Sequence, residues 1–171
     1  LSLHDALPIS YSHGKLSPVA NPIRVGMIVP AGLEESLVHQ MRELDQEHKP
    51  RERKQYLPTL PGFEKVFGVR LTRGGPASRI VLSHDLDRQI EAAAAPHVVL
   101  AEALTRALFA LRNARDSFDI VVILLKESWS PAFRGPAGDD FDLHDYVKAY
   151  AASEGICVQF LREDSALNYH C

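Results

Sequence analysis

The hydrophobic residues of this chain follow two patterns, which alternate along the sequence. Short continuous apolar runs are typical of buried strands, and the most pronounced lie at 23–29 and 118–125. The second run is rich in β-branched residues, as expected of a central strand that is covered on both faces. Shorter apolar runs predict further strands at 68–71, 79–82 and 156–161.

Between these runs, apolar residues recur every three or four positions, which is the spacing of a helix with one buried face. That spacing predicts helices at 33–48, 85–94, 97–115 and 143–154. Ser83 to Asp85 are expected to cap the second of them. The alternation of strands and helices predicts an α/β fold, with a Rossmann-like, mostly parallel sheet, right-handed crossovers and helices on both faces.

The helix predicted at 143–154 has the best-defined start. Asp142 is a favourable N-cap residue, and Asp145 places a negative charge in the first turn, where it suits the helix dipole. Phe141 and Tyr146 have the spacing of a hydrophobic staple. Gly155 is expected to end the helix.

The same helix carries a candidate anion site on the stripe beside its buried face. His144 and Lys148 lie four residues apart there, so both side chains can reach one ligand. Amide groups at a helix start attract anions, and ligands of open α/β sheets collect at the carboxyl ends of the strands. Gln159, on the strand that follows, adds an amide. A His–Lys pair at this spacing also occurs on many solvated helix faces, so the spacing alone leaves both interpretations open.

Composition and charge describe an ordinary globular domain. The 171 residues are 46% hydrophobic and 24% charged, with a net charge of -3 and a pI near 6.2. These values exclude a collagen-like, coiled-coil or disordered chain, and they lack the strongly basic balance that is usual in nucleic-acid-binding domains. Basic residues gather between 39 and 82, where the net charge is +4. This segment is either a solvated loop or a surface that follows a phosphate backbone.

Other candidate chemistry is weaker. A group of aspartates could hold magnesium in a small Rossmann-like phosphohydrolase, although two of the four fit capping roles: Asp139, Asp140, Asp142 and Asp145. The histidines show no metal-ligand spacing, so no metal site is expected. Two cysteines are too few for a disulfide framework, which with the lack of a visible secretory signal or membrane span predicts a cytoplasmic protein. Cys157, inside a predicted strand, is expected to be a core thiol.

The order His144, three residues, Lys148, ten residues, Gln159 matches the 5′-phosphate pocket motif of the MID domain of prokaryotic Argonautes. It does so in the variant that has His where many members have Tyr. The stretches around it also resemble the MID region of short prokaryotic Argonautes, namely NPIRVGMIVPAG, LPGFEKVFGV, FDIVVILLKESW and FDLHDYVKAYAASEGICVQFLRED. The resemblance covers roughly residues 20–165 and is specific over roughly the last fifty of them.

The resemblance implies a binding module rather than an enzyme, one that anchors the 5′ end of an RNA guide directed at invading DNA. Lys148 would neutralise the terminal phosphate, His144 would touch the phosphate and flank the first base, and Gln159 would donate to a phosphate oxygen. The family's motif has a further lysine downstream, and this chain ends at Cys171 before that position. No cofactor is implied within the chain, although a divalent ion (Mg) could accompany the guide phosphate in the full-length protein.

The loop at 126–141 corresponds to one that faces the first base in such proteins, which makes Lys126, Trp129 and Arg134 secondary candidates for guide contact. Packing is the alternative role for Trp129, and solvation is the alternative for the two cations. Besides guide RNA and target DNA, the implied partners are a catalytically inactive PIWI lobe of the same protein and a sirtuin-like or toll/interleukin-receptor-like effector.

The resemblance also sets expectations for domain organisation. Residues 1–12 resemble translated sequencing-adapter read-through and are expected to be non-native. Residues 13–161 are expected to form the MID-like domain, and 162–171 to begin a PIWI-like lobe. A scaffold domain that docks an effector partner through the basic segment at 39–82 remains an alternative, and no membrane contact is expected.

Overall fold

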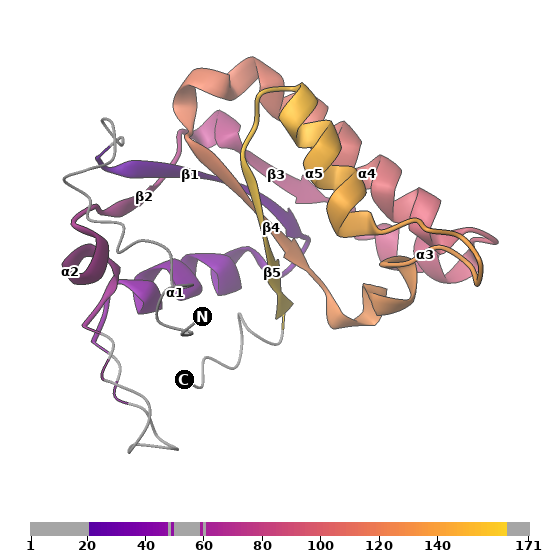
Figure 1. The fold of residues 1–171 in the computed structure, drawn as a ribbon, viewed down its shortest axis with the longest axis horizontal. Coiled ribbons are helices and arrows are strands. Elements are labelled where there is room, and N and C mark those ends of the chain that lie inside the picture. The colour runs from indigo at the N-terminus through magenta and orange to yellow at the C-terminus, as the bar shows by residue number, and fades with distance from the viewer. Residues whose placement is uncertain (1–20, 48, 50–58, 60, 164–171) are drawn as a thin grey trace, which may run out of the picture.

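The computed structural model describes residues 21–47, 49, 59 and 61–163, and within them it places five parallel strands in one sheet (Figure 1). The strand order is β2-β1-β4-β5, and β3 also pairs with β1. The strands are β1 (Ile23–Pro30), β2 (Leu71–Arg73), β3 (Arg79–Leu82), β4 (Ile120–Leu125) and β5 (Val158–Arg162). The predicted Rossmann-like α/β fold with a parallel sheet is therefore confirmed.

One long strand, β1, pairs with two short strands along the same edge. β2 pairs with Ile23 to Val25, and β3 pairs with Met27 to Pro30. Gly26 lies between the two pairings, where an added Cβ would stand 3.2 Å from both the Phe118 ring and the Ser78 carbonyl oxygen. Glycine suits this position because the neighbouring segments approach so closely that a Cβ would require them to shift slightly.

Helix α1 (Glu34–Leu44) covers one face of the sheet (Figure 1). Its buried Leu37 and Met41 pack against alternate side chains of β1. This face forms its own hydrophobic cluster, which also contains Val25, Met27, Val29 and Leu124.

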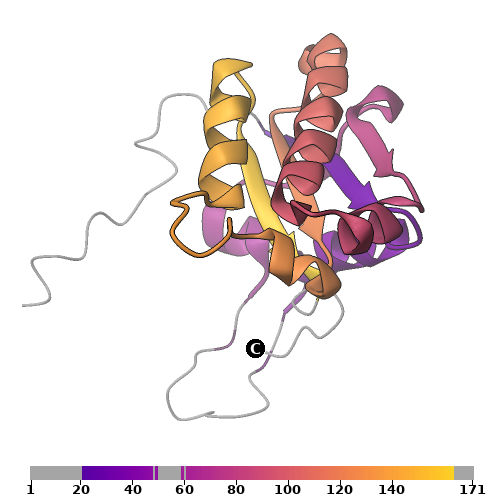
Figure 2. The same cartoon turned by 90° about the vertical axis from the view of Figure 1, so that its right-hand side faces the viewer.

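The opposite face carries α3 (Leu86–Ala92), α4 (Pro96–Leu111) and α5 (Leu143–Ser153), with α4 and α5 side by side in Figure 2. The leucines on one side of α4 are fully buried, namely Leu100, Leu104, Leu108 and Leu111. Since α1 covers the other face, the expectation of helices on both faces is confirmed. None of the described helices is long and apolar enough to cross a membrane.

Several element bounds differ from the predicted ones, and local backbone geometry explains the shifts. The strand expected at 68–71 begins only at Leu71, because Gly68 is in the left-handed conformation that ends the short helix α2 (Phe63–Phe67). The helix expected to reach residue 115 ends as α-helix at Leu111, and a 3-10 segment continues it to Ser117.

The predicted cap of α3 takes a different form. The N-cap residue Asp85 makes no capping bond with its side chain, which instead pairs with Arg88 at 3.0 Å. The hydroxyl of Ser83 accepts a hydrogen bond from the Asp85 amide at 3.1 Å. The turn before α3 is therefore held by a serine that precedes the helix.

Cys157 corrects another expectation, because it is exposed rather than a core thiol. Ile156 and Val158 on either side of it are buried, so alternation along the chain turns Cys157 outward. The prediction was wrong because Cys157 precedes β5 rather than lying inside it, and because β5 is an end strand of the sheet. The segments expected to be non-native and most of the one expected to begin a second lobe lie outside the described residues, as do the basic residues at 51–54.

Candidate functional site

The start of α5 is held as the sequence predicts. Asp142 Oδ1 accepts a hydrogen bond from the Asp145 amide at 3.1 Å, so Asp142 is the N-cap. The rings of Phe141 and Tyr146 contact each other with centroids 5.5 Å apart, which confirms the staple. At the other end, Gly155 has a φ of 68° and follows the last turn. These local contacts fix where the first turn of the helix points.

A cavity of ≈ 450 Å³ opens beside this helix start, at the carboxyl ends of β4 and β5. Its apolar walls come from Leu125, Phe133, Leu143 and Phe160, and its polar lining from Arg134, Asp142, His144, Gln159 and Arg162. All of these residues belong to β4, α5, β5 and the connection between β4 and α5. We refer to this cavity as the α5 pocket. It lies where open α/β sheets bind their ligands.

The connection that precedes α5 is fastened to the helix start. Arg134 Nη1 lies 2.5 Å from Asp142 Oδ2, and the two residues form an isolated antiparallel bridge. The amide of Leu143 donates to the Phe133 carbonyl at 3.0 Å, and that of Gly135 donates to the Phe141 carbonyl at 3.1 Å. Arg134 therefore lines the α5 pocket, as one of the predicted candidates, with its charge already paired to Asp142.

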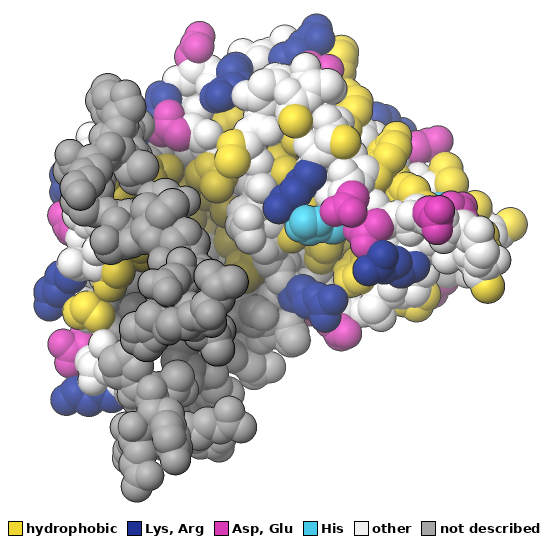
Figure 3. All heavy atoms as spheres, viewed as in Figure 1, with side chains coloured by type: hydrophobic (Ala, Val, Ile, Leu, Met, Phe, Trp, Pro, Cys, Tyr) yellow, Lys and Arg dark blue, Asp and Glu magenta, His cyan; other side chains and the backbone are white. Residues whose placement is uncertain are grey.

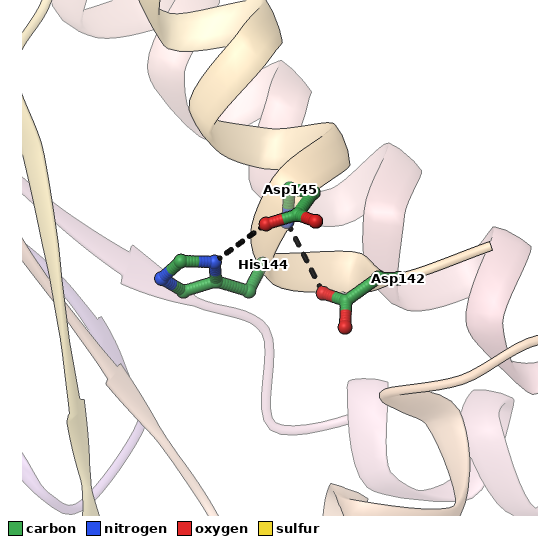
Figure 4. A group of neighbouring side chains, drawn as sticks. All are labelled: Asp142, His144 and Asp145. Atoms are coloured by element: carbon green, nitrogen blue, oxygen red, sulfur yellow. Dashed lines mark hydrogen bonds and ion pairs between the residues drawn. The ribbon is translucent and has the colours of Figure 1, made fainter. Parts of the chain in front are cut away.

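His144 lines the pocket from the first turn of α5. Its side chain is 53% exposed, and Nδ1 lies 3.0 Å from Asp145 Oδ1. In Figure 4 the imidazole extends away from Asp142, on the other side of Asp145. Its ring meets that of Phe160 on β5, with centroids 5.2 Å apart. His144 thus connects the helix start to the strand across the pocket.

The other two motif residues take different positions. Lys148 lies one turn further along α5, is half-buried, and is not among the lining residues. It has no hydrogen bond or ion pair with any residue in the described part of the chain. Gln159 lines the pocket and is exposed, but alternation places it on the face of Leu161, opposite Phe160. The structure therefore brings His144 and Gln159 to one cavity, with Lys148 adjacent along the helix.

The two remaining candidates, Lys126 and Trp129, converge on Asp87 of α3 rather than on the pocket. Lys126 Nζ lies 2.6 Å from one carboxylate oxygen of Asp87, and Trp129 Nε1 donates to the other at 2.6 Å. Burial raises the pKa of Asp87, but these two hydrogen bonds outweigh it and hold the pKa below its usual value. Trp129 is only 2% exposed and packs in the core. Guide contact by either residue remains a prediction.

The structure also places residues at the pocket that the sequence did not single out. Phe133 and Phe160 form aromatic walls, and Arg162 stands at the end of β5. Its guanidinium lies over the Phe133 ring, 5.9 Å from the centroid. The sequence contained one signal for Arg162: it follows the apolar run at 156–161, at the carboxyl end of a predicted strand. A charged residue at that end of a strand lies where ligands of open α/β sheets bind.

Three ligand-type side chains meet at the helix start, with donor atoms of Asp142, His144 and Asp145 all within 4.8 Å of one another (Figure 4). Both carboxylate oxygens of Asp142 are already engaged, one by the Asp145 amide and one by Arg134. Magnesium prefers oxygen ligands, so the imidazole nitrogen of His144 is a poor ligand for it, and Asp145 alone offers a carboxylate not already used as the helix cap. This group therefore suits magnesium poorly: Asp142 caps α5, and the imidazole of His144 contacts the carboxylate of Asp145.

The aspartates ahead of the helix also serve the local fold. Asp139 Oδ1 accepts a hydrogen bond from the Phe141 amide at 2.9 Å, which makes a tight turn. With Asp142 engaged as the cap, two of the four carboxylates expected in a phosphohydrolase cluster bind their own backbone.

Figure 3 shows cationic and acidic side chains interspersed with a histidine on this face of the molecule, rather than a uniform patch of one charge.

Comparison with known proteins gives a likeness in structure alone. No protein-family model matches the chain, and no curated protein matches it in sequence. Among solved structures, it resembles the crystal structure of Aa-Ago, an Aquifex Argonaute, with externally bound siRNA. The TM-score is 0.48 and the sequence identity 18%, over 88% of this chain and 17% of that chain. The likeness is thus one of backbone arrangement, and this chain spans about a sixth of the length of the protein it resembles.

Proposed function

We propose that this chain is a MID-like module that binds the phosphorylated 5′ end of a guide strand. The observation that carries the proposal is the α5 pocket, where His144 and Gln159 of the motif meet at the carboxyl ends of β4 and β5. Lys148 follows one turn along the same helix without an acidic partner in the described chain. A terminal phosphate is a small dianion near neutral pH, which suits a pocket of this kind beside a helix start.

Side chains rather than backbone amides must supply most of the affinity. Three of the first four amides of α5 already have acceptors: Leu143 donates to Phe133, Asp145 to the Asp142 carboxylate, and Tyr146 to the Asp142 carbonyl. Within the described chain this leaves the amide of His144 as the free donor of the helix start. A charge-assisted hydrogen bond contributes about 1.5–3 kcal/mol, so Lys148 and its neighbours matter more here than the helix dipole.

The wider role follows from the resemblance of the motif and its flanking stretches. We propose that the guide is RNA, that it directs recognition of invading DNA, and that the chain itself binds without catalysing a reaction. In the full-length protein, a PIWI lobe and a sirtuin-like or toll/interleukin-receptor-like effector would complete the assembly. Any divalent ion at the guide phosphate would need ligands beyond Asp142, His144 and Asp145.

The test is a comparison of two single-stranded RNA oligonucleotides that differ only in a 5′-phosphate or a 5′-hydroxyl. We expect the 171-residue chain to prefer the phosphorylated strand, and Lys148→Ala to lower that affinity by about ten- to a hundredfold. His144→Ala should also reduce the preference. Fluorescence anisotropy of a 3′-labelled strand measures the affinities of the unsubstituted chain, of Lys148→Ala and of His144→Ala.

Arg106→Ala is the control variant, since Arg106 lies on the exposed face of α4 and pairs with Glu102 of its own helix. It should bind as the unsubstituted chain does. Equal affinity of the unsubstituted chain for the two strands would refute the proposal. Turnover of a phosphate ester that is lost in Asp140→Asn would favour the phosphohydrolase instead.

A further inference from the structure

Besides Arg134, one other cation of the described chain lines the α5 pocket. This residue, Arg162, has no counterpart in the motif of His144, Lys148 and Gln159. We infer that Arg162 binds the 5′-phosphate directly, from the strand side of the pocket, while His144 and Lys148 of the motif approach it from α5. The inference rests on the proposed function, because it assigns a further residue to the same ligand. Four features of Arg162 support it: its place in the sheet, the face it occupies, its lack of an acidic partner and the support of its side chain.

Arg162 is the last residue of β5 and pairs in register with Leu125, the last residue of β4. Both residues line the α5 pocket. The guanidinium group therefore starts from the carboxyl edge of the sheet, beside the helix start that carries His144. A ligand in the pocket would lie between these two elements.

Alternation along β5 places Arg162 on the same face as Phe160. Phe160 packs against the cluster on the α5 side of the sheet, and its ring contacts His144 at 5.2 Å. Arg162 and His144 therefore share one side of the strand. Gln159 lies on the other face, so of the polar residues on β5 that line the pocket, Arg162 is the one directed to the side of α5.

Two other cations of this region, Arg134 and Lys126, are already neutralised by carboxylates. Arg134 pairs with Asp142, and Lys126 pairs with Asp87. Arg162 has no ion pair with any residue between 21 and 163 that the structure describes. An incoming phosphate would therefore not have to displace a carboxylate from Arg162, as it would from Arg134. Arginine also presents a planar fork that binds two phosphate oxygens at once.

The Phe133 ring supports the side chain of Arg162 at a centroid distance of 5.9 Å. A guanidinium that packs on an aromatic ring is restrained before the ligand arrives, so less side-chain freedom is lost on binding. The same ring forms part of the apolar wall of the pocket. The pocket thus combines a cation that lies over an aromatic ring with an apolar wall.

The experiment adds Arg162→Ala and Arg162→Gln to the comparison of 5′-phosphorylated and 5′-hydroxyl RNA strands. Glutamine keeps much of the side-chain stem and some hydrogen bonding but removes the charge, so it separates loss of charge from loss of packing. Both variants should lower affinity for the phosphorylated strand by about ten- to a hundredfold and leave affinity for the hydroxyl strand unchanged. Arg106→Ala again serves as the control, and thermal unfolding verifies that each variant is folded.

The outcomes separate this inference from the proposed function. If the unsubstituted chain prefers the phosphorylated strand and Lys148→Ala abolishes the preference, but both Arg162 variants keep it, the inference is wrong and the function stands. An equal loss for both strands in the Arg162 variants would also overturn it, because the contact would then lie along the backbone. If the unsubstituted chain shows no preference, both proposals fail together.

Discussion

At the scale of single residues, Asp142 holds the candidate site together. One of its carboxylate oxygens caps α5 through the Asp145 amide, and the other pairs with Arg134. The cap is a local interaction within four residues, whereas the ion pair joins the helix to the connection before it. Because the Arg134 side chain is 76% exposed, its pair with Asp142 is weak, and the cap should carry most of the stabilisation.

The two roles of Asp142 can be separated by two substitutions. Asp142→Ala removes both and should lower the free energy of unfolding by about 1–2 kcal/mol, the usual cost of a lost N-cap. Asp142→Asn keeps a capping oxygen and loses only the charge, so it should cost less than about 1 kcal/mol. Urea denaturation measures both values. Equal losses in the two variants would show that the ion pair, and not the cap, stabilises the helix start.

At the scale of elements, an ion pair fastens the beginnings of two central strands. Asp119, just before β4, accepts hydrogen bonds from Arg24 of β1, from Nη2 at 2.8 Å, Nε at 3.1 Å and the backbone amide at 2.7 Å. The hydrogen bond from Arg24 lowers the pKa of Asp119, and this outweighs the rise that burial causes. The usual pKa of this carboxyl is 3.8, so its folded-state value lies below that.

This arrangement predicts a specific dependence of stability on pH. A carboxyl with a lowered folded-state pKa stabilises the protein above its unfolded-state pKa, and that stability is lost as the pH falls through the folded-state value. We therefore expect the unfolding free energy to drop as the pH falls below about 4, and Asp119→Asn to show a shallower drop. Urea denaturation between pH 5 and about 2.5 compares the two. Parallel curves of unfolding free energy against pH for the two proteins would mean that Asp119 does not contribute to the pH dependence of stability.

Elements governed by nearby residues could be predicted from the sequence. The cap, staple and glycine end of α5 all depend on contacts within a few residues, and each appears as expected. Contacts between distant segments could not: Asp87 receives Lys126 and Trp129 from 39 and 42 residues away. The exposure of Cys157 was missed because an apolar run shows neither where a strand begins nor which strand will lie at the end of a sheet. Arg162 was missed because its partner ring, Phe133, lies on a segment without periodicity.

At the scale of the whole molecule, charge is balanced rather than concentrated. The net charge is -3, and many described cations pair with carboxylates on the surface. Such a surface offers little non-specific attraction to a nucleic-acid backbone. Binding through the α5 pocket should therefore depend on a few local contacts, and its dependence on salt should be small.

The salt dependence of binding tests this expectation. For single strands, each phosphate contact contributes about 0.7 to the slope of log affinity against log salt concentration. Contacts from Lys148 and Arg162 alone predict a slope near -1.4 for the phosphorylated strand, and each alanine variant should reduce its magnitude by about 0.7. Anisotropy titrations between 50 and about 300 mM salt measure it. A slope several times steeper would indicate a broad basic surface, such as the segment at 39–82.

The lining of the α5 pocket runs from Leu125 to Arg162, within a single strand–helix–strand unit of the chain. The proposed recognition site thus occupies one part of the sequence, whereas the hydrophobic core draws on residues from β1 to β5. Residues before β4 form α1 on one face of the sheet and α3 and α4 on the other, so they contribute to how firmly the unit is held. Substitutions there can be engineered for stability with the proposed binding contacts left intact, whereas the 43 residues of the unit, from Ile120 to Arg162, carry both constraints at once.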